Sequence, residues 1–129
     1  MNHFLKEKNI TLELHCEPAD LKKTFDKDLM LSAINNFIDN AVKASHENSR
    51  ILVTADVQQL TVQDFGKGIP AEDIDKVTEA FYMVDKSRSR ANGSVGLGLA
   101  LCRKIADLHG FPMEIESEPE KGTRIIMKW

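Results

Sequence analysis

The stretch DLMLSAINNFIDNAVKAS, residues 28–45, sets the fold class of this chain. Its apolar residues recur at spacings of one, three and four, which predicts a long amphipathic helix with one broad buried face. They are Leu29, Met30, Ala33, Ile34, Phe37, Ile38, Ala41 and Val42. Asp26 or Asp28 is placed to cap the start of this helix.

Strand patterns lie on both sides of this helix. Alternating apolar residues predict strands over 10–16, 51–57, 60–63, 113–117 and 123–129. Shorter helices are expected over 71–79 and up to His109, where Gly110 would end the second one. Two consecutive hairpins argue against a doubly wound parallel sheet. We therefore expect an α/β fold, a two-layer sandwich with a mixed, mostly antiparallel sheet of about five strands covered on one face by about three helices.

Two details of packing follow from the same patterns. Leu97, Leu101, Ile105 and Leu108 are expected to share the apolar face of the last helix. Cys16 and Cys102 are expected in the core, and so few cysteines suit a reducing compartment. His109 is expected to be a helix-end residue and not a ligand.

Composition narrows the class of protein. The chain has 129 residues, of which 42% are hydrophobic and 29% charged, as in one globular domain. Its net charge of -3 argues against a surface for nucleic acid. No apolar run approaches the roughly 18 residues of a membrane span, and the N-terminus lacks the apolar segment of a signal peptide. We expect a cytoplasmic domain that makes no contact with nucleic acid or with a membrane.

Two asparagines on the long helix form the first candidate site. Asn36 and Asn40 are four residues apart, which places both amides on one face, with Lys43 next to them. An amide oxygen is a suitable ligand for Mg²⁺, and an amide NH₂ can donate to a phosphate. Two ordinary surface amides are the alternative.

Asp64-Phe65-Gly66-Lys67-Gly68 forms the second candidate site, at the end of a strand. A carboxylate there accepts hydrogen bonds from an amino group, such as that of adenine, and glycines allow the backbone close to a flat ring. A common glycine turn after a strand is the alternative.

Two further segments are suited to phosphate. GSVGLG, residues 93–98, opens the last helix, whose free N–H groups and dipole favour an anion. It matches neither a Walker loop nor a dinucleotide fingerprint. The segment before it carries Lys86, Arg88 and Arg90, which could close over a γ-phosphate. A plain helix start and a solvated loop are the alternatives.

Taken in this order, the segments resemble the catalytic and ATP-binding domain of bacterial two-component sensor histidine kinases, in the GHKL ATPase superfamily. INNFIDNAVKAS (34–45) resembles the N box of that family, and VQDFGKGIP (62–70) its first glycine box. EAFYMVDKSRSR (79–90) resembles the F box, and GSVGLGLALCRKIADLHG (93–110) the second glycine box. ESEPEKGTRIIMKW (116–129) resembles the terminal hairpin.

The resemblance implies that ATP and Mg²⁺ bind between the helices and a lid. Asp64 would bind the adenine amine, and Asn40 would ligate Mg²⁺. Asn36 and Lys43 would contact the phosphates and are the expected catalytic residues. The other nucleotide-binding residues that the resemblance implies are Gly66, Gly68, Ile69, Phe81, Lys86, Arg88, Arg90, Gly93, Val95, Gly96, Leu97, Gly98, Leu99 and Thr123.

Asn36 also points to one branch of the superfamily. ATP-hydrolysing members carry a glutamate four residues before the metal-binding asparagine, and an amide in its place cannot take a proton from water. The resemblance therefore implies transfer of the γ-phosphoryl group to a histidine, with a response regulator downstream.

None of His3, His15, His46 and His109 has the context of the family's phosphoacceptor, which lies in a separate dimerisation domain of the same kinase. We expect residues 1–8 to be the end of a dimerisation helix or a linker, and 9–129 to be the catalytic domain. The chain would then be a monomeric fragment of a longer protein, whose membrane anchoring the sequence leaves open.

Two other functions fit the same motifs. An anti-sigma-factor-type serine kinase has this fold in one short chain, but it would carry a glutamate where Asn36 stands. A nucleotide-binding interaction module with degenerate catalysis would bind ATP without phosphorylating a supplied histidine domain.

Overall fold

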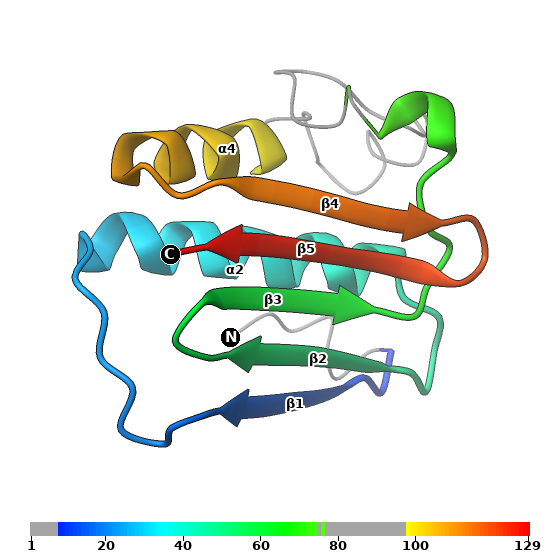
Figure 1. Ribbon diagram of the computed structural model, residues 1–129. Helices are drawn as coiled ribbons and strands as arrows, with labels where there is room; N and C mark the ends of the chain where they lie inside the picture. The colour runs from blue at the N-terminus through cyan, green and yellow to red at the C-terminus, as the bar shows by residue number, and fades with distance from the viewer. Residues whose placement is uncertain (1–7, 75, 77–97) are drawn as a thin grey trace.

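A five-stranded mixed sheet organises the molecule, of which the computed structural model describes residues 8–74, 76 and 98–129 (Figure 1). Its strands are β1 (Thr11–Cys16), β2 (Arg50–Ala55), β3 (Gln59–Asp64), β4 (Met113–Glu118) and β5 (Gly122–Lys128). Their order is β1-β2-β3-β5-β4, with β1 parallel to β2 and the other neighbours antiparallel. The α/β class and the mixed, mostly antiparallel sheet are confirmed.

Two helices in the described part of the chain pack together beside this sheet. α2 (Lys27–Ala44) crosses behind the middle strands, and α4 (Gly98–His109) lies along the β4 edge (Figure 1). Of the helix expected over 71–79, Ala71–Asp73 form a short 3-10 helix, η1, and part of the remainder lies outside the described residues. Neither α2 nor α4 has the length and apolar content that a membrane span requires.

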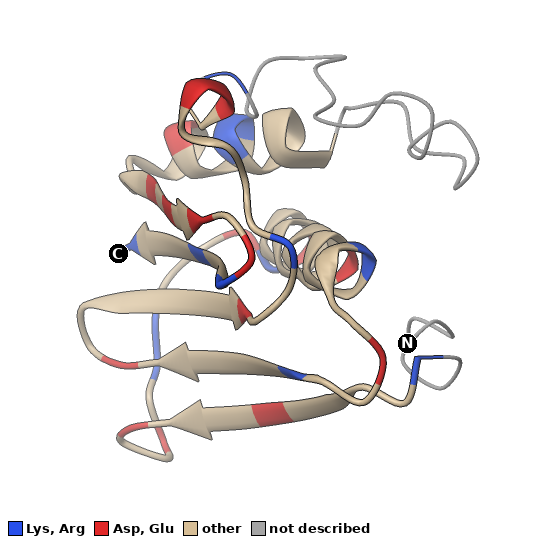
Figure 2. Ribbon diagram, turned by 90° about the vertical axis from the view of Figure 1, so that its right-hand side faces the viewer, with Lys and Arg blue, Asp and Glu red and all other residues tan. Residues whose placement is uncertain are grey.

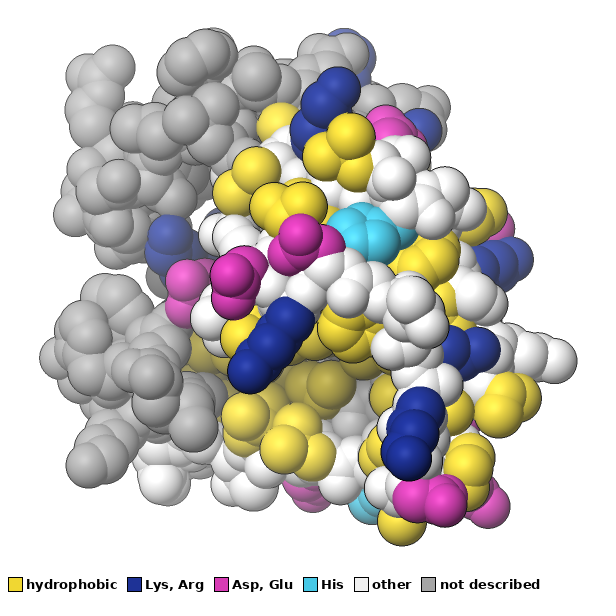
Figure 3. Space-filling view, turned by 90° about the vertical axis from the view of Figure 1, so that its left-hand side faces the viewer, with side chains coloured by type: hydrophobic (Ala, Val, Ile, Leu, Met, Phe, Trp, Pro, Cys, Tyr) yellow, Lys and Arg dark blue, Asp and Glu magenta, His cyan; other side chains and the backbone are white. Residues whose placement is uncertain are grey.

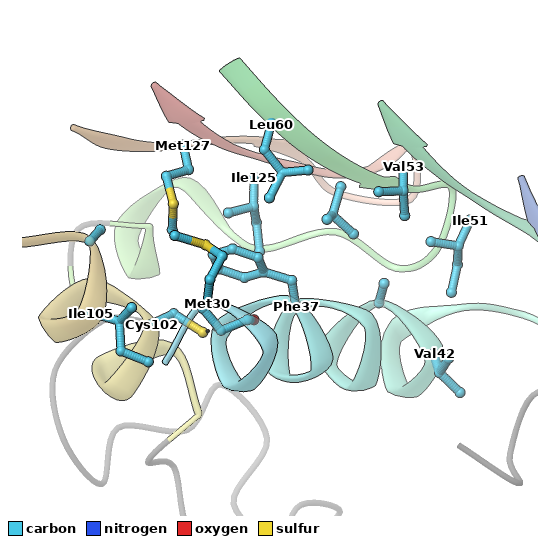
Figure 4. Close-up of a cluster of buried hydrophobic side chains, with 14 of the residues drawn as sticks. Met30, Phe37, Val42, Ile51, Val53, Leu60, Cys102, Ile105, Ile125 and Met127 are labelled. Atoms are coloured by element: carbon cyan, nitrogen blue, oxygen red, sulfur yellow. Dashed lines mark hydrogen bonds between the residues drawn. The ribbon is translucent and has the colours of Figure 1, made fainter. Parts of the chain in front are cut away.

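The helix α2 forms where the apolar period predicts it. Its N-cap is Asp26, whose carboxylate accepts a hydrogen bond from the Leu29 amide at 3.0 Å. Met30 and Phe37 extend from α2 toward Ile125 and Met127 of β5 (Figure 4). Burial of such large side chains contributes roughly 1.5–3 kcal/mol each, so this interface anchors the helix to the sheet.

The buried face of α4 differs from the one expected. Cys102, Ile105 and Ala106 are buried, whereas Leu101 is 44% exposed and Leu108 is 65% exposed. The small side chains of Cys102 and Ala106 let α4 approach α2 closely, and the Cys102 thiol donates to the Ala33 carbonyl at 3.4 Å. Helix-to-helix contact therefore decides which side of α4 is buried, and the leucine pattern was misleading.

The two cysteines have different environments. Cys102 is buried, and burial raises the pKa of its thiol to about 12. Cys16 is exposed, contrary to expectation, because it ends the edge strand β1, where little of the helical layer covers it.

His109 connects the C-terminal end of α4 to the N-terminal end of α2. Its Nε2 accepts a hydrogen bond from the Asp26 amide at 2.9 Å, and its Nδ1 lies 2.8 Å from the Ile105 carbonyl. Because Nε2 accepts, the proton is on Nδ1 and is donated to that carbonyl. The expected helix-end role of His109 is confirmed.

Candidate functional site: a polar row beneath two helix ends

A polar row interrupts the inner, helix-covered face of the sheet. The strand register places five residues side by side on this face, in the order Leu12, Ile51, Asp64, Thr123 and Ser117. In the next row all five are apolar: Leu14, Val53, Val62, Ile125 and Ile115. Asp64 and Thr123 are only 5% and 7% exposed. Buried polar groups on an otherwise apolar face indicate a binding site or a structural network.

Asp64 provides a buried carboxylate at the end of β3. Its Oδ1 accepts a hydrogen bond from the Gly66 amide at 2.9 Å. Burial raises the pKa of Asp64, and the amides of Gly66 and Thr123 and the charge of His46 offset part of that rise. The carboxylate retains further lone pairs, so it can accept a hydrogen bond from an amino group of a ligand.

The loop after Asp64 is held between α2 and the β4–β5 hairpin. A Cβ on Gly66 would lie 2.0 Å from the Ala44 carbonyl oxygen, and one on Gly68 would lie 2.2 Å from that of Glu118. Gly68 also has a φ of 72°, in the left-handed region that favours glycine. Protein backbone therefore fills the space beside both glycines, and their absent side chains let the loop pack.

Hydrogen bonds hold the same loop on both sides. The Lys67 amide donates to the Ala44 carbonyl at 3.1 Å, and the Glu120 amide donates to the Lys67 carbonyl at 2.7 Å. The Ile69 amide donates to the Ser117 hydroxyl at 2.7 Å. The position of Asp64 is thus tied to the end of α2 and to the hairpin.

The two asparagines meet the first residue of α4. A Cβ on Gly98 would lie 3.6 Å from Asn36 Oδ1 and 3.6 Å from Asn40 Nδ2. Asn36 Nδ2 donates to the Ser32 carbonyl at 3.0 Å, which leaves Asn36 Oδ1 on the Gly98 side. The structure therefore brings together three of the residues expected at the phosphate end.

Asn40 stands out within this group. Its Nδ2 atom is buried and, among the residues that the structure describes, has no hydrogen-bond partner. An unpaired buried amide costs about 1–3 kcal/mol. The amide of Asn40 therefore has hydrogen-bonding capacity that a ligand could use.

Of the remaining expected residues, two are described by the structure and eight are not. Lys43 follows Asn40 by one turn of α2 and is half-buried, and Leu99 is half-buried against the core. Eight of them lie outside the described residues, so their predicted roles stay predictions: Phe81, Lys86, Arg88, Arg90, Gly93, Val95, Gly96 and Leu97.

One member of the polar row, Ser117, was not among the expected site residues. Its hydroxyl contacts Ile69, Gly122 and Thr123. The alternation of the strand over 113–117 does place Ser117 on the same face as Met113 and Ile115. A serine at an inward position of an apolar strand was the signal available in the sequence.

In the part of the chain that the structure describes, no group of three or more His, Cys, Asp or Glu side chains could hold a metal ion.

Sensor histidine kinases are among the known proteins with similar sequences. The chain is 35% identical to the sensor histidine kinase WalK of Bacillus subtilis over 126 residues, which cover 93% of this chain and 21% of WalK. It is 45% identical to the histidine-protein kinase ArlS of Staphylococcus aureus over 91 residues, which cover 67% of this chain and 20% of ArlS. The chain thus spans about a fifth of the length of these curated relatives.

Solved structures agree as well. The catalytic domain of histidine kinase ThkA, in a nucleotide-free form, superposes with a TM-score of 0.82 at 26% identity, covering 96% of this chain and 80% of that one. ThkA in complex with the response regulator TrrA superposes with a TM-score of 0.75 at 26% identity, covering 96% of this chain and 35% of that one.

The family match covers most of the described chain. Residues 25–129 match the family of histidine kinase-, DNA gyrase B- and HSP90-like ATPases, and this range contains α2, Gly98 and the polar members of the row, Asp64, Ser117 and Thr123. On its fold, its site and this match, the chain belongs to that family of ATPases.

Proposed function

We propose that this chain is the ATP-binding catalytic domain of a sensor histidine kinase. It binds ATP with Mg²⁺ and transfers the γ-phosphoryl group to a histidine on a separate dimerisation domain. The observation that carries the proposal is the buried, unpaired amide of Asn40, which lies on the same helix face as Asn36, beside Gly98. The kinase assignment is supported by the similarity to WalK, ArlS and ThkA.

Asp64 and Gly98 suit the two ends of a nucleotide. The Asp64 carboxylate accepts a hydrogen bond from the adenine amine. Gly98 begins the 12-residue helix α4, whose N-terminal end favours the negative charge of phosphates. The two residues lie beside different turns of α2. The loop after Asp64 is bonded to Ala44 at the end of the helix, and Gly98 lies beside Asn36, two turns earlier.

The residues present fit a magnesium ion. Asn40 can turn its amide so that the oxygen faces a cation, and Asn36 Oδ1 already lies on the Gly98 side. Mg²⁺ prefers oxygen ligands and commonly keeps phosphate oxygens and waters among them, so few protein ligands suffice. When bound, the ion neutralises charge on the phosphates.

Asn36 favours phosphoryl transfer over hydrolysis. Its amide cannot act as a general base, so water near the γ-phosphate is not activated at this position. A histidine nitrogen needs no such base, because its lone pair attacks phosphorus directly. The N–P bond forms as the bond between γ-phosphorus and the β-bridging oxygen breaks, and ADP leaves with that oxygen. Catalysis then depends on position and charge, which Asn36, Lys43 and the start of α4 supply.

The same proposal implies a domain division and a partner for the kinase. Residues 1–8 would be the end of a dimerisation helix or a linker, and 9–129 would be the catalytic domain, in the cytoplasm. A response regulator would take the phosphoryl group from the histidine, in keeping with the ThkA–TrrA complex.

Titration calorimetry with Mg²⁺ and ADP tests the nucleotide site. We expect Asp64→Ala to lower the affinity at least about tenfold, because a hydrogen bond to a charged group is lost. Asp56→Ala is the matched control, since Asp56 also accepts two backbone amides in a turn after a strand, away from the site. If wild type does not bind ADP, or if both variants lose the same affinity, the proposed site is wrong.

A further inference from the structure

The Ser117 hydroxyl is the centre of a small hydrogen-bond network beside Asp64. Its Oγ lies 2.7 Å from the Ile69 amide nitrogen, 3.0 Å from the Gly122 carbonyl oxygen and 2.8 Å from Thr123 Oγ1. Ser117 and Thr123 are directly opposite each other on β4 and β5, and Thr123 is directly opposite Asp64 on β3. The network therefore lies in the same row as the Asp64 carboxylate, which accepts the Thr123 backbone amide and which the proposed function assigns to the base.

Counting protons fixes the direction of these bonds. The Ile69 amide can only donate, and the Gly122 carbonyl can only accept. Ser117 has a single hydroxyl proton, so all three contacts are hydrogen bonds only if that proton goes to Gly122. The bond between the two hydroxyls must then use the proton of Thr123. With its proton directed at Ser117, Thr123 presents lone pairs alone to a ligand.

The edge of the site then consists of acceptors. The Asp64 carboxylate and the Thr123 hydroxyl oxygen are neighbours in one row, and neither has a proton to offer. Such an edge suits a base with an amino group, and it disfavours a base with a carbonyl at the same place, because two acceptors would face each other.

We propose that Ser117 is a positioning residue that sets base selectivity: it holds the proton of Thr123 and so keeps the site selective for 6-aminopurine over 6-oxopurine nucleotides. This inference rests on the proposed function, because it takes Asp64 as the site of the base. Ser117 acts through Thr123 and need not touch the nucleotide.

The test compares ADP with IDP, which carries a carbonyl in place of the amino group. Calorimetry on the full chain gives the ratio of the two dissociation constants. In Ser117→Ala, the Thr123 proton loses its acceptor and can turn toward a carbonyl of the base. We expect the preference for ADP over IDP to fall about tenfold, roughly one hydrogen bond, and Ser117→Thr to restore it.

Two further variants separate selectivity from stability. Thr54→Val is the matched control, because the Thr54 hydroxyl bonds to the Thr61 hydroxyl in the alternate row, on the other face of the sheet. It is expected to leave the ratio unchanged even if it lowers the melting temperature. Thr123→Val removes the hydroxyl that Ser117 orients, so it should lower the preference as Ser117→Ala does, even if Ser117→Ala fails to fold.

The outcomes distinguish this inference from the proposed function. If wild type does not bind ADP, or Asp64→Ala binds it as well, the proposed function fails and this inference with it. If ADP binds at Asp64 but the ratio stays within twofold in both Ser117→Ala and Thr123→Val, only the inference is overturned. An equal fall of the ratio in Thr54→Val would also overturn it.

Discussion

At the scale of single residues, Asp64 is proposed to bind the base, yet its buried charge lowers the stability of the fold. Its carboxylate is buried on an otherwise largely apolar face, and burial raises its pKa above the ordinary 3.8. The folded chain therefore holds this proton more tightly than the unfolded chain does. Stability from Asp64 is fully present below the unfolded pKa and is lost as the pH rises through the folded pKa.

Asp64→Asn is accordingly expected to unfold at an equal or higher urea concentration than wild type at pH 7. The Asn carbonyl can still accept the Gly66 amide, and the cost of a buried charge is gone. The stability difference should shrink as the pH falls toward 3.8, where wild type also becomes neutral. ADP affinity should fall in the same variant. Urea denaturation at several pH values measures the effect, and a variant clearly less stable than wild type at pH 7 would contradict it.

Gly66 is needed for packing of the loop, whereas Gly98 lies beside the proposed phosphate site. Substitution of each by alanine distinguishes these two roles. In Gly66→Ala the new Cβ would lie 2.0 Å from backbone, so we expect a loss of at least about 1–3 kcal/mol of stability. In Gly98→Ala the nearest atoms are 3.6 Å away, and alanine favours a helix by about 0.5–1 kcal/mol. The Gly98 variant should keep its melting temperature but bind ADP more weakly, because the methyl lies beside the Asn36 and Asn40 amides. Equal ADP affinity in Gly98→Ala would argue against phosphate at this place.

At the scale of elements, the C-terminal end of α2 is where distant segments meet. The Lys8 ammonium donates to the carbonyls of Val42 at 3.0 Å, Lys43 at 3.3 Å and Ser45 at 3.1 Å. The Ser45 hydroxyl donates to the Ala41 carbonyl, and the Lys67 amide to that of Ala44. The helix-end carbonyls thus have partners, and Lys8, which we expected in the end of a dimerisation helix or in a linker, is bound to the end of α2.

Lys8→Met is expected to lower the free energy of unfolding by about 1–3 kcal/mol, because carbonyls in a half-buried position lose a charged donor. Lys22→Met, at an exposed lysine before α2, is the control and should change it by less than about 0.5 kcal/mol. Urea denaturation of both variants gives the comparison. Similar values for the two would mean that Lys8 does not hold the end of α2.

At the scale of the whole molecule, the edge of the sheet formed by β4 is charged. On β4, Glu114, Glu116 and Glu118 are exposed and form ion pairs with Lys128, Arg124 and Lys121 (Figure 2). Charged edge strands discourage pairing with another sheet. On the face seen in Figure 3, charges of both signs are interspersed with apolar groups. We therefore expect sedimentation velocity to show a monomer, and a dimer would contradict this interpretation of the β4 edge.

The described histidines are poorly placed to accept a phosphoryl group. His109 accepts a hydrogen bond from the Asp26 amide at the start of α2, more than three helical turns from Asn40. His46 is close enough to Asp64 to lower the pKa of its carboxyl, so it lies at the proposed base end of the site. His15 belongs to the outward-facing row of the sheet. With labelled ATP, we expect no acid-labile label on this chain alone and a label on a supplied histidine-containing dimerisation domain. Label on the chain alone, or ADP binding without any transfer, would contradict the kinase proposal, and the second result would favour an interaction module.

Local patterns along the chain were enough to predict most helices and strands and several residues of the candidate site. Helix period, strand alternation and the Asp26 cap are local, since they depend on residues within a turn or two of one another. The positions of α2 and of the sheet strands were therefore predictable within a few residues. Asn36, Asn40 and Asp64 were recognisable because an ordered set of local motifs carries them.

Features that depend on residues far apart in the chain became visible only in the three-dimensional structure. The buried side of α4 follows from its contact with α2, and the partner of Lys8 is more than 30 residues away. Ser117 joins the site through the pairing of β4 with β5 and of β5 with β3. These contacts were not predictable from local patterns, because strand register and helix packing are set by the whole core and not by neighbouring residues.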